Sequence, residues 1–402
     1  MMARINDRMS GLSARWGMIA AALAAIMATL WLGNYQSADL QLRVGREMLF
    51  PKAATGDIHI VEIDSRSIRE MESWPWKRRI HGQVVDQLRE AGAKVVAFDV
   101  DFSSPSNPED DRLFAESLRR IGGGAVLPTF RQLVSDTGTL FSENIPIQEL
   151  RANAFLGSVN VHPDTDGAMR TFPFGTITDN VARPSLAALL AGQSGNVEDH
   201  FRLSSAINPA TIPRHSAMDI IQGRFNPADV RGKTMLIGAT AIEMGDRYAV
   251  DGHGVIPGVV VQAMAAETLV QGLDYRNYGP YPSILLALLG TLYASRIWSL
   301  RQRLGRLALA SCAVTLLPFL IETFQWGTIE VVPALLGLGS TMIATVAIDY
   351  VRRLSLARMS DGETGLANKR ALEHALVRGG SKVWGHRHHH VAQILSSNHG
   401  SA

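Results

Sequence analysis

Residues 81–100 read HGQVVDQLREAGAKVVAFDV, and this stretch decides the fold. Its first half places apolar residues at helical spacing and stops at a glycine. Its second half is a short apolar run, which is typical of a buried strand. The segment IHIVEI (58–63) before it is another such run. The order strand, helix, strand predicts a partly parallel sheet that is covered by helices.

The same alternation continues along the chain. DDRLFAESLRR (110–120) is an amphipathic helix and GAVLPTF (124–130) a strand, while KTMLIGAT (233–240) is a strand before the helix PGVVVQAMAAETLV (257–270). We therefore expect residues 34–280 to form an α/β domain with a mixed sheet and flanking helices. The chain has one cysteine, so this domain folds without an internal disulfide.

Four long apolar runs flank the domain. A bilayer core needs about 20 mostly apolar residues in a helix, and we predict four transmembrane helices at 16–33, 281–300, 307–325 and 329–350. A cleaved signal peptide is the alternative for the first run. Its apolar stretch is long for that role, and Gln36 stands where a small residue should precede the cut.

Arginines predict the orientation of these runs, because short cytoplasmic loops collect positive charge. They cluster before the first run, between the second and third, and after the fourth, whereas the loop between the third and fourth has no Lys or Arg. We expect residues 1–15 and the C-terminal end in the cytoplasm and the domain outside it, as in a multi-pass inner-membrane protein with a periplasmic domain. The arginines are Arg4, Arg8, Arg15, Arg301, Arg303, Arg306, Arg352, Arg353 and Arg358.

Several ordered blocks resemble one family. They are DSRS (64–67), WPWKR (74–78), AGAKVVAFDVDF (91–102), VNVHPDTDGAMRTFPF (159–174), GKTMLIGATAIEMGDRY (232–248) and PGVVVQA (257–263). In this order they resemble a CHASE2 sensory domain. Residues 262–264 read Gln-Ala-Met where the family commonly reads His-Ala-Asn, which weakens any ligand role carried over to that position.

Polar residues at predicted strand ends are the candidate ligand site, because ligands of open α/β sheets bind at the carboxyl ends of the strands. Carboxylates with an arginine can hold a polar ligand or a hard cation such as Ca²⁺ or Mg²⁺. The alternative is structural: such residues cap turns and helices or pair with a neighbour, and the Trp-Pro-Trp segment packs over the core. The candidates are Asp64, Trp74, Trp76, Asp99, Asp101, Asp246 and Arg247.

Known catalytic patterns are missing from the sequence. It contains no hydrolase elbow, Walker loop, HExxH or CxxC, and its histidines lack metal-ligand spacing. We expect a binding domain without a catalytic residue, metal site or cofactor. The formal charge of +2 gives no sign of a nucleic-acid partner.

The C-terminal segment MSDGETGLANKRALEHAL (359–376) looks like the start of a GGDEF (diguanylate cyclase) domain. The GG[DE]EF turn that such enzymes need does not follow it, so we expect no cyclic dinucleotide synthesis. Residues 351–378 would be a cytoplasmic linker with this truncated start. Residues 379–402 would be a disordered histidine-rich tail, out-of-frame sequence or a metal-binding tract.

The combined hypothesis is a membrane-anchored signal-transduction sensor that detects an extracytoplasmic stimulus and has an incomplete output domain. Its partners would be the lipid bilayer, a small-molecule or envelope stimulus and, by resemblance to cyclases, a second copy in a homodimer. Two alternatives stay open: a truncated copy of a diguanylate cyclase, and a membrane scaffold or transport-associated protein.

Overall fold

The computed structural model describes residues 2–72, 74–133, 141–297 and 299–359. The chain divides into two compact units. The membrane-helix unit comprises residues 1–33, 282–315 and 331–402, and the α/β unit comprises residues 34–281 and 316–330. The predicted GGDEF-like segment from residue 360 onward and the histidine-rich tail lie outside the described residues.

A seven-stranded sheet forms the centre of the α/β unit, in the order β10-β1-β11-β2-β3-β4, with β5 also paired to β3. All its pairs are parallel except β3 with β4. The predicted mixed sheet is confirmed, although β11 lies between β1 and β2, far from both in sequence. The strands are β1 (Ile58–Ile63), β2 (Val95–Asp99), β3 (Ala125–Leu133), β4 (Phe141–Asn144), β5 (Phe155–Ser158), β10 (Arg214–Ser216) and β11 (Thr234–Ala239).

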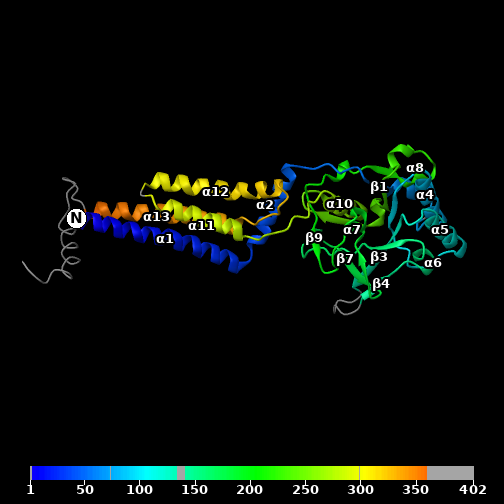
Figure 1. The fold of residues 1–402 in the computed structure, drawn as a ribbon, viewed down its shortest axis with the longest axis horizontal. Coiled ribbons are helices and arrows are strands. Elements are labelled where there is room, and N and C mark those ends of the chain that lie inside the picture. Colours follow the sequence, from blue (N-terminus) through cyan, green and yellow to red (C-terminus); the bar gives the residue numbers. More distant parts are fainter. Residues whose placement is uncertain (1, 73, 134–140, 298, 360–402) are drawn as a thin grey trace, which may run out of the picture. The chain divides into compact units, whose positions relative to one another are not determined.

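Helices cover both faces of this sheet (Figure 1). One core lies beneath α4 (Arg78–Glu90), α5 (Pro108–Arg120) and α8 (Ala217–Ile221), and the other lies beneath α7 (Leu186–Ala191) and α10 (Gly258–Val270). Successive strand residues alternate between the two cores, because side chains point to opposite faces of a sheet. In β2, Ala97 belongs to the α10 core, while Val96 and Phe98 belong to the α4 core.

Smaller elements complete the α/β unit. Three two-stranded antiparallel sheets lie outside the main one, and short helices connect the strands. The paired strands are β6 (Thr171–Pro173) with β9 (His200–Arg202), β7 (Gly175–Thr178) with β8 (Val181–Pro184), and β12 (Arg247–Val250) with β13 (Gly254–Pro257). The remaining helices are α2 (Tyr35–Leu49), α3 (Ser65–Glu70), α6 (Gln148–Arg151) and α9 (Pro227–Val230).

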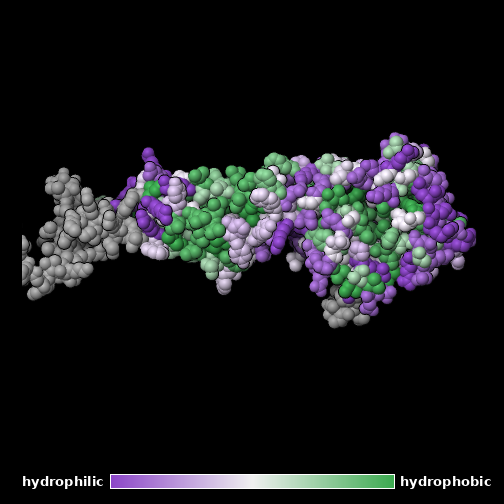
Figure 2. Space-filling view, viewed as in Figure 1, coloured by the Kyte–Doolittle hydropathy of each residue, from purple (hydrophilic) through white to green (hydrophobic). Residues whose placement is uncertain are grey.

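Helices make up the membrane-helix unit: α1 (Met2–Leu32), α11 (Tyr281–Ser295), α12 (Leu300–Thr323) and α13 (Val332–Met359), although residues 316–323 of α12 belong to the α/β unit. Their surface is largely apolar (Figure 2). Small residues let α1 and α13 pack closely, as is common between membrane helices. A Cβ at Gly337 would lie 2.8 Å from Ile26 Cγ1, and the Ser340 hydroxyl donates to the Ala21 carbonyl oxygen at 3.0 Å.

Three helical segments in the described residues, not the predicted four, are long and apolar enough to cross a membrane. They are Ala14–Leu32, Leu300–Thr323 and Val332–Ser355. The predicted second span falls short because its helix, α11, ends at Ser295 after 15 residues. At about 1.5 Å per residue this helix is about 22 Å long, less than the roughly 30 Å hydrocarbon core.

The arginines expected between the second and third spans also need correction. Arg301, Arg303 and Arg306 lie in the first two turns of α12 rather than in a loop. The apolar run from residue 307 extends backwards as helix, because arginine is a good helix former. The connection between α11 and α12 therefore shrinks to residues 296–299.

Candidate functional site

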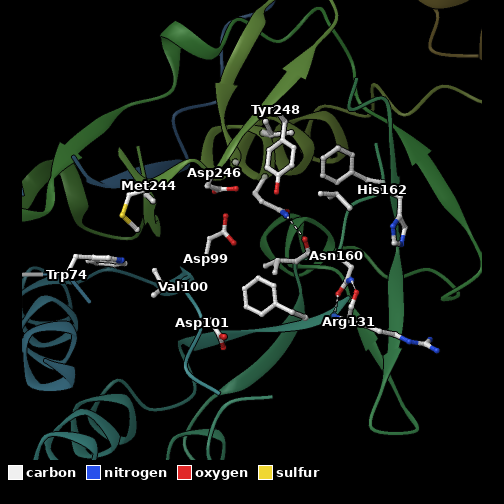
Figure 3. Close-up of a pocket in the computed structure, with 18 residues that line it drawn as sticks. Trp74, Asp99, Val100, Asp101, Arg131, Asn160, His162, Met244, Asp246 and Tyr248 are labelled. Carbon is white, nitrogen blue, oxygen red and sulfur yellow. Dashed lines mark hydrogen bonds between the residues drawn. The ribbon is translucent and has the colours of Figure 1, made fainter. Parts of the chain in front are cut away.

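A cavity of about 690 Å³ lies at the carboxyl ends of the parallel strands β2, β3, β5 and β11 (Figure 3). This is the edge at which open α/β sheets bind ligands. Four of the seven residues predicted from the sequence line the cavity: Trp74, Asp99, Asp101 and Asp246. Three of these, Asp99, Asp101 and Asp246, were predicted from strand ends. The cavity brings together residues as far apart in the chain as Trp74 and Asp246, which are 172 positions apart.

Asp99 and Asp246 lie side by side in this cavity (Figure 3). Asp99 is the last residue of β2, and Asp246 follows a left-handed turn at Gly245, whose φ is +71°. The Asp246 carboxyl packs directly against Gly258 at the start of α10, where any side chain would collide with it. A Cβ at Gly238 would lie 3.3 Å from the Asp99 Cβ and 2.6 Å from Val259 Cγ2. Two glycines therefore make room for the carboxyl pair.

Burial and mutual repulsion change the acidity of this pair. Burial, and then the charge of Asp246, raise the pKa of Asp99 to about 7. Burial also raises the pKa of Asp246, while its hydrogen bond with Tyr248 opposes that rise. The pKa of Tyr248 rises to about 12, through burial and then through Asp246. Near neutral pH Asp99 is therefore partly protonated, and a bound cation would favour its ionised form.

Two other polar side chains of the cavity, Gln262 and Asn160, are engaged with the backbone. The Gln262 side-chain amide donates to the Val159 carbonyl oxygen at 3.1 Å. Asn160 accepts from the Arg131 backbone N–H at 2.8 Å and donates to the Arg131 carbonyl oxygen. The apolar lining comes from side chains of several elements: Trp74, Phe130, Val159, Val161, Phe172, Met244 and Val261. The carboxyl pair is thus set in largely apolar surroundings.

The other three predicted site residues have structural contacts, as the alternative interpretation proposed. The Asp64 carboxyl caps α3 by accepting from the Ser67 N–H at 2.6 Å. Trp76 is 4% exposed and belongs to the α4 core. Arg247 donates to the Val255 carbonyl oxygen at 2.9 Å within the β12–β13 hairpin.

Tyr248, Asn160 and Gln262 line the cavity but were not among the predicted residues. Asn160 follows β5, so the strand-end rule that found Asp99 would also have found it once β5 was recognised. Gln262 occupies a position at which this sequence departs from the family pattern. It lies within helix α10, where the strand-end rule does not apply. No group of three His, Cys, Asp or Glu residues in the described ranges is arranged to hold a metal ion. The Ca²⁺ or Mg²⁺ interpretation therefore has no structural support there.

The fold and cavity define a class: an α/β domain with a cavity at the carboxyl ends of its strands, in one chain with helices that are long and apolar enough to span a membrane. A family model of the CHASE2 domain matches residues 18–297, which is well over half of the chain. The chain therefore belongs to the CHASE2 family, whose domain is a sensory domain of signalling proteins. No curated protein and no solved structure matches the chain.

Proposed function

We propose that the chain is a membrane-anchored signalling sensor whose CHASE2 domain binds a small ligand in the cavity at the carboxyl ends of β2, β3, β5 and β11. One observation carries the proposal: two carboxyls, Asp99 and Asp246, share a largely apolar cavity of about 690 Å³. The ligand that this chemistry favours is an organic cation, such as an amine with an apolar body. The ammonium group would neutralise the carboxyl pair while Trp74 and Phe130 contact the apolar part.

We place this domain outside the cytoplasm of a multi-pass inner-membrane protein. Charge supports that orientation, because residues 324–331 between α12 and α13 contain no Lys or Arg, whereas Arg352 and Arg353 follow the apolar part of α13. The short helix α11 would be the fourth crossing, with local bilayer thinning to match its length. Four crossings return the C-terminal end to the side of the N-terminus.

Signalling in this proposal is a shift between two arrangements of the sensor. A ligand moves such an equilibrium only through its different affinity for the two arrangements. Helix α13 continues from its apolar part to Met359 without a break, and it leads directly into the GGDEF-like segment. We infer that this helix transmits the change to the cytoplasmic end, that the chain works as a homodimer, and that the chain binds rather than catalyses.

The test is a thermal-shift screen of the full chain in detergent micelles. A panel of aliphatic and aromatic amines is compared with neutral analogues of the same shape. We expect some amines to raise the unfolding temperature and Asp246→Asn to weaken their binding by about tenfold or more, which is about 1.4 kcal/mol. Asp57→Asn is the matched control, because Asp57 is exposed and pairs with Lys233 away from the cavity.

Two results would contradict the proposal. One is a shift of equal size in Asp246→Asn and in the wild type. The other is equal stabilisation by the neutral analogues, which would remove the role of the carboxyl pair.

A further inference from the structure

A second cavity, of about 740 Å³, lies in the α/β unit away from the carboxyl pair. Its lining combines mostly polar residues of α2 with residues 163–166, Arg170, Arg202 on β9, Asn277 and residues 328–330. Helix α2 begins at Tyr35, shortly after α1 ends, and residue 330 directly precedes the segment that enters α13. The lining segments are thus chain neighbours of two helices that can span a membrane.

Arg43 lines this cavity, and one nitrogen of its guanidinium group lacks a hydrogen-bond partner among the described residues. Its side chain is nine-tenths buried, and its Nε donates to Glu47 Oε1 at 2.8 Å. Its Nη2 is buried and has no hydrogen-bond partner in the described part of the chain. The second carboxylate oxygen of Glu47 is also engaged, because it accepts from the Ser205 N–H at 2.7 Å. A buried donor without a partner costs about 1–3 kcal/mol, more when it is charged.

Arg202 adds a second positive charge beside the first. No ion pair joins it to any residue in the described ranges. Burial, followed by the charge of Arg43, lowers the pKa of Arg202 to about 10. Two arginines that repel each other in a buried setting are costly unless an anion lies between them.

The other charged residues of the lining are Arg170 and four carboxylates, and each of them has interactions of its own. Arg170 binds three carboxylates, with distances of 2.9 Å to Asp164, 2.7 Å to Asp166 and 2.6 Å to Asp251. Asp39 and Glu330 act on Tyr35. Burial, and then the charges of Glu330 and Asp39, raise the pKa of Tyr35. Within the part of the chain that the structure describes, Arg43 keeps one donor without a partner although it pairs with Glu47, so the cationic donors left for a ligand are Arg43 Nη2 and the Arg202 guanidinium.

We propose that this cavity binds a phosphate group between Arg43 Nη2 and the Arg202 guanidinium. Guanidinium groups match the oxygens of phosphate by paired, charge-assisted hydrogen bonds. The group can come from a phospholipid headgroup or from free phosphate. A lipid source is favoured because residues 35–50 and 324–330 also expose large apolar side chains, including Leu49 at 69%, Phe50 at 66% and Trp326 at 65%.

The experiment uses the full chain in maltoside micelles, which contain no phosphate. Three additions are compared by thermal unfolding: phosphatidylglycerol, a galactosyl diacylglycerol with the same acyl chains, and inorganic phosphate. We expect phosphatidylglycerol to raise the unfolding temperature more than the galactolipid does. Stabilisation by inorganic phosphate alone would support the same site with a free anion as its ligand.

Two variants connect the effect to the arginines. Arg202→Gln should reduce the apparent phosphate affinity by about tenfold or more. Arg202→Lys keeps the charge but loses the paired donors of the guanidinium group, so it should reduce the affinity less. Arg214→Gln is the matched control, because Arg214 pairs with Glu62 outside this cavity. An unchanged response in Arg202→Gln, or equal responses to the two lipids with none to inorganic phosphate, would overturn the proposal.

A measurement without added ligand gives an independent check. Removing the charge of Arg202 relieves its repulsion with Arg43, so Arg202→Gln should unfold at the same or a higher temperature than the wild type when no phosphate is present. A lower unfolding temperature would mean that Arg202 is already neutralised inside the protein, and it would also overturn the proposal.

Discussion

Replacing Asp99 with asparagine should stabilise this protein at neutral pH. The raised pKa of Asp99, about 7 against 3.8 for an ordinary aspartate, means that the folded state resists losing this proton. Between these two pH values the unfolded chain is ionised at this position while the folded chain is not. The unfolded state therefore binds fewer protons, and stability falls as pH rises through this window. Asparagine keeps the shape but cannot ionise.

The size of the effect follows from the same numbers. Each pH unit of the window contributes about 1.4 kcal/mol, so about 3 units give roughly 4 kcal/mol. Asp99 is partly exposed at the cavity, and solvent screening makes this an upper limit. For a domain of this size, about 2–4 °C of unfolding temperature corresponds to 1 kcal/mol. The variant should therefore gain at most about 8–16 °C over the wild type at pH 7.5.

The assay is thermal unfolding of both proteins in micelles at pH values from 4 to 8. The difference between Asp99→Asn and wild type is the informative quantity, because it cancels the titration of every group that does not interact with Asp99. We expect the difference to be small near pH 4 and to grow until about pH 7. Asp101→Asn makes the same change on an exposed side chain two residues away and serves as the control. A difference that stays constant with pH, or a less stable Asp99→Asn at pH 7.5, would refute the reasoning.

Three other changes test the packing around the sheet. Burial, then the charge of Arg78, lowers the pKa of His81 to about 3; stability should therefore fall as pH drops below about 6.5, and His81→Phe should move the acid-unfolding midpoint to lower pH. Gly238→Ala places a Cβ 2.6 Å from Val259 Cγ2 and should lower the free energy of unfolding in denaturant by about 1–3 kcal/mol. Gly45→Ala is the control, because Gly45 has open space around it and the change should not destabilise the protein. Trp76→Ala empties a core site and should cost about 3–5 kcal/mol; a cost as large for the partly exposed Trp74→Ala would show that Trp74 is equally a core residue.

Much of this architecture could be predicted from local pattern. Short apolar runs and helical spacing identified β1, α4, β2 and α10 because burial on a sheet or helix face imposes those periods. Span length was predicted less well, since hydropathy locates an apolar run but does not say where its helix ends. At Ser295 the helix stops, and the arginines of residues 301–306 join the next helix.

The sequence by itself determined the fold class and the family, because these depend on periodicity and on ordered local blocks, and it predicted the edge of the sheet where a site would lie. Only the tertiary structure decided which candidate residues share a cavity. Asp64 and Asp99 both stand at the end of a strand, yet one caps the helix that follows it and the other lies beside Asp246. The insertion of β11 between β1 and β2, which brings the segment of Asp246 next to β2, is a long-range pairing that no local pattern encodes.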